Sequence, residues 1–299
     1  MVEKPDYILC VQHGWADDHS GIARLANKLA TPDTIILNPD LGWLKTWYRI
    51  NTLINTVEKN VTQILAEYPE TPIRVIGHSM GGLIWLEILN RNPEWWSNVK
   101  ALVLIASPIS GAGLARIIDP VSVGVGIAKD LGTNRRELAE EIAKYVPTLS
   151  IAGNLYNWGS DGTIPVASTK FAGAKCISLD GISHPALKNH PRLVGVIQDF
   201  WANPIITPTS ELTFVDKLIQ RLRSIHGITD ASQLHFARST PYFTFDNGVT
   251  IRNWKPPIFM DWVFVVSPEG ECLYSAFVGW LHTHNLYKEL EEIKSMKNE

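Results

Sequence analysis

The hydrophobic residues of the first two hundred positions fall into short uninterrupted runs, with helically spaced segments between them. Apolar runs without alternation are typical of strands that are buried on both faces of a parallel sheet. Such runs lie at 7–11, 34–37, 73–76, 101–105, 148–152 and, more weakly, 175–179. Apolar residues with helical spacing lie at 53–65, 83–89 and 187–200. Strands that alternate with helices predict an α/β fold with a doubly wound, mostly parallel sheet.

Residues 110–147 interrupt this alternation. The segment is rich in glycine and alanine at first and becomes charged from Asn134 to Glu141. It lies between the predicted strands at 101–105 and 148–152, so it passes over the carboxyl ends of the strands, where open α/β sheets bind ligands. We therefore predict a helical cap insertion over a site, with a plain connecting helix as the alternative.

A different pattern follows a predicted linker at 203–210, which contains Pro204 and Pro208. A helix is predicted from about 211 to 226, with Gly227 as its cap. Two hairpins and a helix from about Asn285 come next. The chain is thus predicted to hold an α/β domain at 1–202 and a small α+β module at 211–299.

The first predicted hairpin has two alternative loops. A three-residue loop, Asp246-Asn247-Gly248, pairs Phe245 with Val249 and Phe243 with Ile251 on one face of the hairpin. A two-residue loop would place Phe245 opposite Thr250 and mix the faces. We therefore predict the longer loop, with Gly248 in the left-handed region. The second hairpin is predicted to join 262–266 to 272–277.

Composition narrows the class of protein. The chain has 299 residues, of which 45% are hydrophobic and 19% charged, with a formal net charge of -3. The sequence has no basic run of the kind that would indicate a nucleic-acid partner. No apolar stretch is long enough to cross a bilayer, so we expect a cytoplasmic protein. The oligomeric state stays open.

The three cysteines are widely spread. Cys10 and Cys176 lie in predicted strands, so we expect buried free thiols there. Cys272 lies in the second module. The spacing of the three residues indicates neither a disulfide framework nor a zinc site, and we expect no metal and no cofactor.

The chemistry centres on Gly77-His78-Ser79-Met80-Gly81-Gly82, which has the form G-x-S-x-G. The motif follows the predicted strand at 73–76 and opens the predicted helix at 83–89. A strand, a tight turn and a helix are what a nucleophilic serine needs in order to project above a sheet. The N–H group of Met80, at the helix start, would then face a developing oxyanion.

A second oxyanion donor is expected after the first strand, where His13-Gly14-Trp15 ends the apolar run. The N–H group of Trp15 follows a permissive glycine and is our candidate. The alternative is that His13 and Gly14 only form a turn that ends the strand.

The serine also needs a base and an acid to orient it. His184 lies between the last predicted strand and the last predicted helix of the α/β domain, and is our candidate base, with His190 as the weaker one. Asp161, in a glycine-rich loop after the strand at 148–152, is our candidate acid. Asp180, beside Gly181, is its rival and has a turn-capping role as its alternative.

Taken together, these segments resemble the α/β-hydrolase family and, within it, lipases and esterases. The resemblance covers about residues 5–202 and rests on His13-Gly14-Trp15, the motif at 77–82, Ala106-Ser107-Pro108-Ile109-Ser110-Gly111, Ser160-Asp161-Gly162-Thr163-Ile164-Pro165 and Ser183-His184-Pro185. It implies a serine hydrolase that cleaves a small-molecule carboxylic ester with Ser79, His184 and Asp161. Trp15, Trp43, Trp47 or Trp158 would line the substrate site.

Three other interpretations stay open. A thioesterase or acyltransferase would use the same three residues. A different enzyme class, such as a haloperoxidase or lyase, can share the fold. The α/β domain could also be the scaffold of a non-catalytic binding protein.

Overall fold

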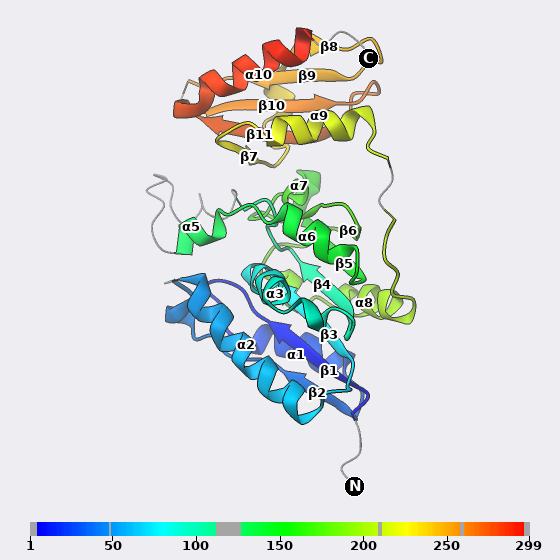
Figure 1. Cartoon of the computed structure of the whole chain (residues 1–299). Helices are drawn as coiled ribbons and strands as arrows, with labels where there is room; N and C mark the ends of the chain where they lie inside the picture. The colour runs from blue at the N-terminus through cyan, green and yellow to red at the C-terminus, as the bar shows by residue number, and fades with distance from the viewer. Residues whose placement is uncertain (1–4, 48, 112–126, 209–210, 258–259, 296–299) are drawn as a thin grey trace. The chain divides into compact units, whose positions relative to one another are not determined.

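A computed structural model describes residues 5–47, 49–111, 127–208, 211–257 and 260–295 (Figure 1). The chain divides into two compact units. The first unit is Met1–Tyr156 with Asp161–Thr209, and the second is Asn157–Ser160 with Ser210–Glu299.

The first unit is built on a six-stranded sheet in which every neighbouring pair runs parallel. Its strands are β1 (Tyr7–Gln12), β2 (Thr34–Leu37), β3 (Ile73–His78), β4 (Val99–Ile105), β5 (Thr148–Asn154) and β6 (Ala174–Asp180), in the spatial order β2-β1-β3-β4-β5-β6. The chain winds outward in both directions from β1 and β3, so ligands are expected at the carboxyl ends of these two strands. The predicted doubly wound α/β sheet is confirmed.

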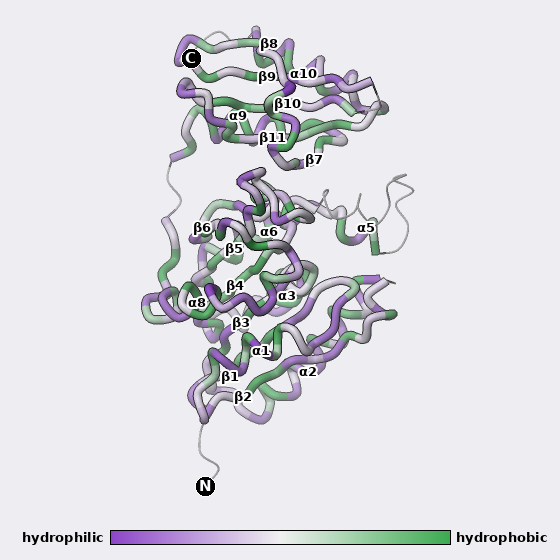
Figure 2. Tube along the Cα trace, turned by 180° about the vertical axis from the view of Figure 1, so that it is seen from behind, coloured by the Kyte–Doolittle hydropathy of each residue, from purple (hydrophilic) through white to green (hydrophobic). Residues whose placement is uncertain are grey.

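Helices cover both faces of this sheet because its central strands are apolar on both sides. Leu9 and Val11 of β1 share a core with α1 (His19–Leu29) and α8 (Arg192–Ala202). Ile8 and Cys10 share the opposite core with α2 (Ile50–Glu67) and α3 (Met80–Arg91). Figure 2 shows hydrophobic segments along the strands and hydrophilic ones in the connections.

Shorter helical segments connect these elements. They are η1 (Trp43–Trp47), η2 (Pro93–Trp95), η3 (Leu155–Asn157), α7 (Val166–Thr169) and η4 (Ala186–Lys188). Helix α1 was not predicted from the sequence, although its residues carry two signals of a helix. Asp18 caps it by accepting the N–H of Ser20 at 2.8 Å. Its buried apolar residues also have helical spacing: Ile22, Leu25, Ala26 and Leu29.

Residues 112–126 of the predicted cap lie outside the described residues. The rest of it contains α5 (Ile127–Leu131) and α6 (Arg136–Ala143). Ile127, Leu131 and Ile142 are buried in the core that also holds α2 and α3. The described part of the insertion therefore packs as an ordinary part of the first unit, and the cap over the site stays a prediction.

The second unit has a separate five-stranded sheet in the order β7-β11-β10-β9-β8, with antiparallel neighbours. The strands are β7 (Ile228–Asp230), β8 (Thr240–Thr244), β9 (Thr250–Trp254), β10 (Met260–Val266) and β11 (Cys272–Gly279). Its helical segments are α9 (Phe214–Arg223), η5 (Phe236–Arg238), η6 (Trp280–His282) and α10 (Thr283–Ser295). The predicted small α+β module is confirmed.

The loop predicted for the first hairpin is also confirmed. The N–H of Phe245 donates to the oxygen of Val249 at 2.8 Å, and Phe243 is paired with Ile251. Gly248 has a φ of 84°, the left-handed conformation that this loop requires. The turn therefore sets the register that keeps Phe243 and Phe245 on one face.

Two expectations were wrong. Cys176 is exposed rather than buried, because β6 is an edge strand on which only Ala174 and Leu179 are fully buried. Helix α9 ends at Arg223, before the predicted end at 226, and Gly227 lies in the turn that leads to β7, with a φ of 88°.

Candidate active site

Ser79 occupies a sharp turn between β3 and α3. Its φ of 54° and ψ of -123° are unusual for a residue with a side chain and carry a strain of about 1–3 kcal/mol. The surrounding structure holds this conformation. The N–H of Ser79 donates to the oxygen of Ile105 at 2.8 Å, and the N–H of Gly82 donates to the oxygen of Ser79 at 3.1 Å. The turn is therefore built into the sheet rather than left as a free loop.

The glycines of the motif are required by close packing. A Cβ on Gly77 would lie 2.4 Å from the backbone of Gly82, and a Cβ on Gly82 would lie 2.0 Å from Oγ of Ser107. A Cβ on Gly81 would lie 2.3 Å from the oxygen of Gln12. These distances leave no room for any side chain, so the glycines allow α3 to start directly against the sheet.

The loop after β1 passes directly beside Ser79. A Cβ on Gly14 would lie 2.9 Å from Cβ of Ser79 and 3.4 Å from its Oγ. The backbone of Gly14 is thus close to the serine side chain, and Trp15, the candidate oxyanion donor, is the next residue along this loop. Met80 is the first residue of α3, where the helix dipole favours a developing negative charge.

His13 holds this loop in place. Its side chain is fully buried, and its Nε2 accepts the N–H of Leu41 at 3.1 Å. Its Nδ1 must then carry the proton, which it donates to the oxygen of Gly14 at 3.0 Å. Burial lowers the pKa of His13 despite this hydrogen bond and the nearby Asp17, Asp40 and Asp18. The neutral imidazole therefore ties the loop to the chain after β2, an anchor that the sequence analysis missed.

Asp161 and His184 are hydrogen-bonded to each other. Nδ1 of His184 lies 2.7 Å from Oδ2 of Asp161, and the N–H of His184 donates to the oxygen of Asp161 at 2.9 Å. Oδ1 of Asp161 accepts the N–H groups of Thr163 at 2.9 Å and Ile164 at 2.6 Å. The Asp161 side chain is only 1% exposed, and three donors satisfy its buried carboxylate. Nδ1 of His184 is thus fixed as the protonated nitrogen, which leaves Nε2 of the neutral ring free of a proton.

The rival residues lie elsewhere. Asp180 is exposed at the end of β6 and accepts a hydrogen bond from Asn154 at 2.9 Å. His190 is part of the turn before α8, where its Nδ1 accepts the N–H of Arg192 at 3.3 Å. Neither residue contacts the pair of Asp161 and His184 in the hydrogen bonds of the described residues. The geometry therefore favours Asp161 and His184 over them.

His184 also lies against the serine turn. The ring of His78, which directly precedes Ser79, is centred 4.9 Å from the ring of His184. The elements that carry the serine, the histidine and the aspartate thus meet at the carboxyl ends of β3, β5 and β6 (Figure 1). In open α/β sheets, ligands bind just outside the carboxyl ends of the strands.

Three tryptophans gather beside the loop after β1. The rings of Trp15 and Trp47 are 4.4 Å apart, and those of Trp43 and Trp47 are 5.7 Å apart. Trp43 is 51% exposed and Trp47 is 41% exposed, so both present apolar surface next to the candidate oxyanion loop. Trp158, the fourth tryptophan predicted to line the site, belongs to the second unit.

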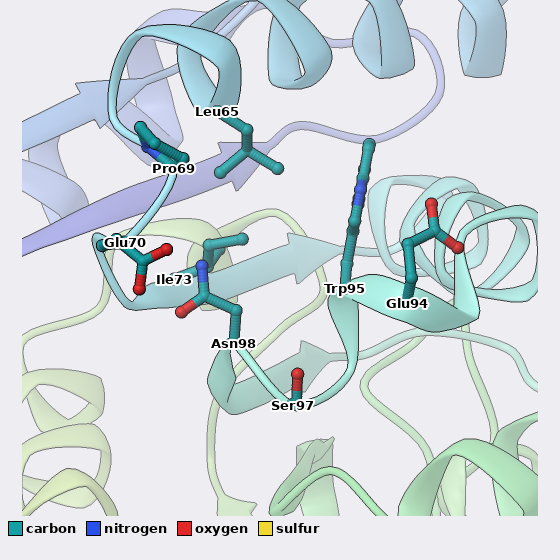
Figure 3. A pocket seen from close by; sticks show the side chains of 8 residues that line it. All are labelled: Leu65, Pro69, Glu70, Ile73, Glu94, Trp95, Ser97 and Asn98. Atoms are coloured by element: carbon teal, nitrogen blue, oxygen red, sulfur yellow. The ribbon is translucent and has the colours of Figure 1, made fainter.

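A hollow of about 410 Å³ lies at the opposite end of the strands, where β3 and β4 begin (Figure 3). Its lining includes Pro69 and Glu70 before β3, and Trp95 and Asn98 before β4. These positions are at the amino ends of the strands, so the hollow is separate from the serine turn. Among the described residues, no helix is long and apolar enough to cross a membrane, and no three metal-ligating side chains form a cluster.

The comparison with protein families agrees with this fold. Residues 3–154 match the model of a hydrolase family described as serine aminopeptidase, S33. Because the match spans half of the chain and includes the strand, turn and helix around Ser79, the chain belongs to this family of α/β-hydrolases. The family expected from the sequence motifs is therefore confirmed.

Solved structures show the same fold. Est1E from Butyrivibrio proteoclasticus, solved with ferulic acid bound, is 16% identical, with a TM-score of 0.51 over 68% of this chain and 91% of that one. A Bacillus licheniformis lipase, BlEst2, is 13% identical, with a TM-score of 0.50 over 67% of this chain and 93% of that one. Among curated proteins, none matches the sequence.

Proposed function

We propose that the protein is a serine hydrolase that cleaves a small-molecule carboxylic ester by acyl transfer to water. The observation that carries this proposal is the 2.7 Å hydrogen bond between Nδ1 of His184 and Oδ2 of Asp161. This pair lies at the carboxyl ends of the strands, as does the strained Ser79. A buried carboxylate that orients a histidine beside a serine on a tight turn is the arrangement that nucleophilic acyl transfer needs.

In the proposed mechanism, Oγ of Ser79 attacks the acyl carbon while Nε2 of His184 takes its proton. Asp161 stabilises the imidazolium that forms, and the N–H groups of Met80 and Trp15 donate to the oxyanion. The imidazolium then protonates the leaving alcohol. Water, deprotonated by the same histidine, then attacks the acyl-enzyme and releases the carboxylic acid and Ser79. Neither a metal nor an organic cofactor takes part in these steps.

Two neighbouring activities use the same steps. The family description, serine aminopeptidase, favours an amide substrate as the second candidate. A thioester or an acyl acceptor other than water would change only the leaving group or the second nucleophile. A hydrolase domain that serves as a non-catalytic scaffold would have no need of the strain at Ser79.

A substrate panel tests the proposal. p-Nitrophenyl esters from acetate to palmitate, an acyl thioester and an aminoacyl p-nitroanilide are compared by kcat/KM on the wild type and on Ser79→Ala. We expect the highest value on an ester and its loss in the variant. A higher value on the anilide or thioester would assign that activity instead, and turnover unaffected by Ser79→Ala would overturn the proposal.

A further inference from the structure

His78 is the one histidine at the serine turn to which the proposed mechanism gives no role. It is the last residue of β3 and is only 4% exposed. Its ring packs against that of His184, with the two ring planes tilted by 36°. Its Nε2 also lies 3.2 Å from the main-chain oxygen of His184. The residue before the nucleophile thus contacts both the ring and the backbone of the base.

The hydrogen bond fixes the protonation of His78. A carbonyl oxygen can only accept, so Nε2 of His78 carries the proton and donates it. Among the described residues, Nδ1 of His78 is buried without a hydrogen-bond partner. Burial, and to a smaller extent His184, Lys188 and His13, hold the pKa of His78 well below its usual range. His78 is therefore a neutral donor at physiological pH.

This donor joins the serine strand directly to the histidine, in addition to the indirect connection through the sheet, and it shares the oxygen of His184 with the N–H of Leu187 at 3.3 Å. Asp161 binds His184 through its carboxylate and its main-chain oxygen, which fixes the base relative to the loop after β5. His78 binds the oxygen of His184 from β3, the strand that carries Ser79. Acyl transfer depends on the distance between serine and base, and a misplacement of 1 Å can lower the rate by about 10².

We propose that His78 is a positioning residue that keeps His184 in line with Ser79 by donating its Nε2–H to the main-chain oxygen of His184. The proposal rests on the proposed function, since it assumes that His184 is the base. His78 contacts no substrate atom and transfers no proton in the proposed mechanism, so its role differs from those of the reacting groups.

Two substitutions separate the hydrogen bond from the filling of space. The amide nitrogen of Gln is the same number of bonds from Cβ as Nε2 of His, so His78→Gln keeps a donor near the oxygen of His184. His78→Met fills a similar volume with a flexible apolar chain and offers no donor. We expect His78→Met to lower kcat by tenfold or more with KM changed by less than twofold, and His78→Gln to recover most of that loss.

Proton NMR supplies a readout that simple destabilisation would not move. The Nδ1–H of His184, strongly hydrogen-bonded to Asp161, is expected far downfield in the wild type. His78→Met should broaden or shift this resonance at a temperature where the variant is fully folded, and His78→Gln should restore it. His190→Met, at a half-buried histidine close in sequence, is the control and should leave kcat and the resonance unchanged.

The proposal is overturned if the Gln and Met variants lose kcat equally, or if the loss appears in KM. Should His78→Met fail to fold, His78→Asn replaces it, because its amide is one bond too short to reach the same oxygen. Asn must then lose kcat relative to Gln. Ser79→Ala is measured in parallel. If Ser79→Ala retains turnover, the proposed function fails. If Ser79→Ala is inactive but His78→Gln and His78→Met have the same kcat, only the proposed role of His78 is contradicted.

Discussion

The two units bury carboxylates with different kinds of partner. In the first unit, Asp161 is bound to His184, whose imidazole has one nitrogen that can donate a hydrogen bond and one that can accept a proton. In the second unit, Asp230 is bound to the hydroxyl of Tyr274 at 2.6 Å and to Arg223 at 3.4 Å. Asp261 accepts the hydroxyl of Thr283 at 2.6 Å. Hydroxyl and guanidinium groups are poor general bases, so burial of a carboxylate does not by itself indicate a catalytic site, and the nature of its partner has to be considered.

The largest effect is expected at His184, the partner of Asp161. His184→Ala should lower kcat by roughly 10⁶, about as much as loss of the serine itself, because residues of such a triad act as a unit. His190→Ala should change kcat by less than twofold, since the ring of His190 accepts the N–H of Arg192 at the start of α8 and is not hydrogen-bonded to Asp161 or His184 in the described residues. Steady-state kinetics on a p-nitrophenyl ester measure both. A severe loss in His190→Ala and a mild one in His184→Ala would exchange their roles.

The next largest effect is expected at Asp161. Asp161→Asn should lower kcat by roughly 10³ to 10⁴, because the amide favours the wrong tautomer of His184. The matched variant is Asp180→Asn, which alters an exposed carboxylate bonded to Asn154 and should leave kcat almost unchanged. Kinetics and thermal melting of both variants are compared. If Asp180→Asn were the inactive one, Asp161 would not be the orienting acid.

Asp230→Asn should show the opposite behaviour, with stability lost rather than chemistry. It removes the partner of Arg223, whose side chain is only 20% exposed, and breaking a buried ion pair costs about 3–5 kcal/mol. Urea denaturation of the whole chain measures the loss of unfolding free energy. Glu269→Gln, at an exposed turn, is the control and should stay within about 0.5 kcal/mol. An unchanged unfolding curve for Asp230→Asn would show that the pair does not stabilise the second unit.

The smallest effect concerns the buried histidines of the first unit. Burial lowers the folded-state pKa values of His13 and His78 below 6.5. Below that pH the unfolded chain therefore binds more protons at these histidines than the folded chain does. Stability should therefore be complete above pH 6.5 and fall as the pH drops. His78→Gln removes one of these groups and should reduce the slope by an amount that grows as the pH falls and approaches about 1.4 kcal/mol per pH unit near pH 5. Urea denaturation between pH 6.5 and 5 measures it, and equal slopes would contradict a neutral His78.

Local patterns in the sequence predicted most of the first unit. The apolar runs located all six strands, because strands buried on both faces leave few polar positions. The glycines around Ser79 predicted the turn, because only they allow the close approach of α3 to the sheet. Asp161 and His184 were predicted from their order along the chain, and the structure brings them together.

Contacts between distant segments could not be predicted in this way. The bond from Leu41 to His13 and that from His78 to the oxygen of His184 join residues 28 and 106 positions apart. Nothing in either local sequence marks these residues as partners. The exposure of Cys176 likewise depends on the position of β6 at the sheet edge, which strand order sets and hydrophobicity does not.

The central claim is that Ser79 is the nucleophile, and covalent labelling tests it most directly. The wild-type chain is treated with a fluorophosphonate, its intact mass is measured, and the modified peptide is sequenced. We predict one adduct, on Ser79, and none on Ser79→Ala under the same conditions. An adduct on another residue, or labelling of Ser79→Ala at the wild-type rate, would contradict the account.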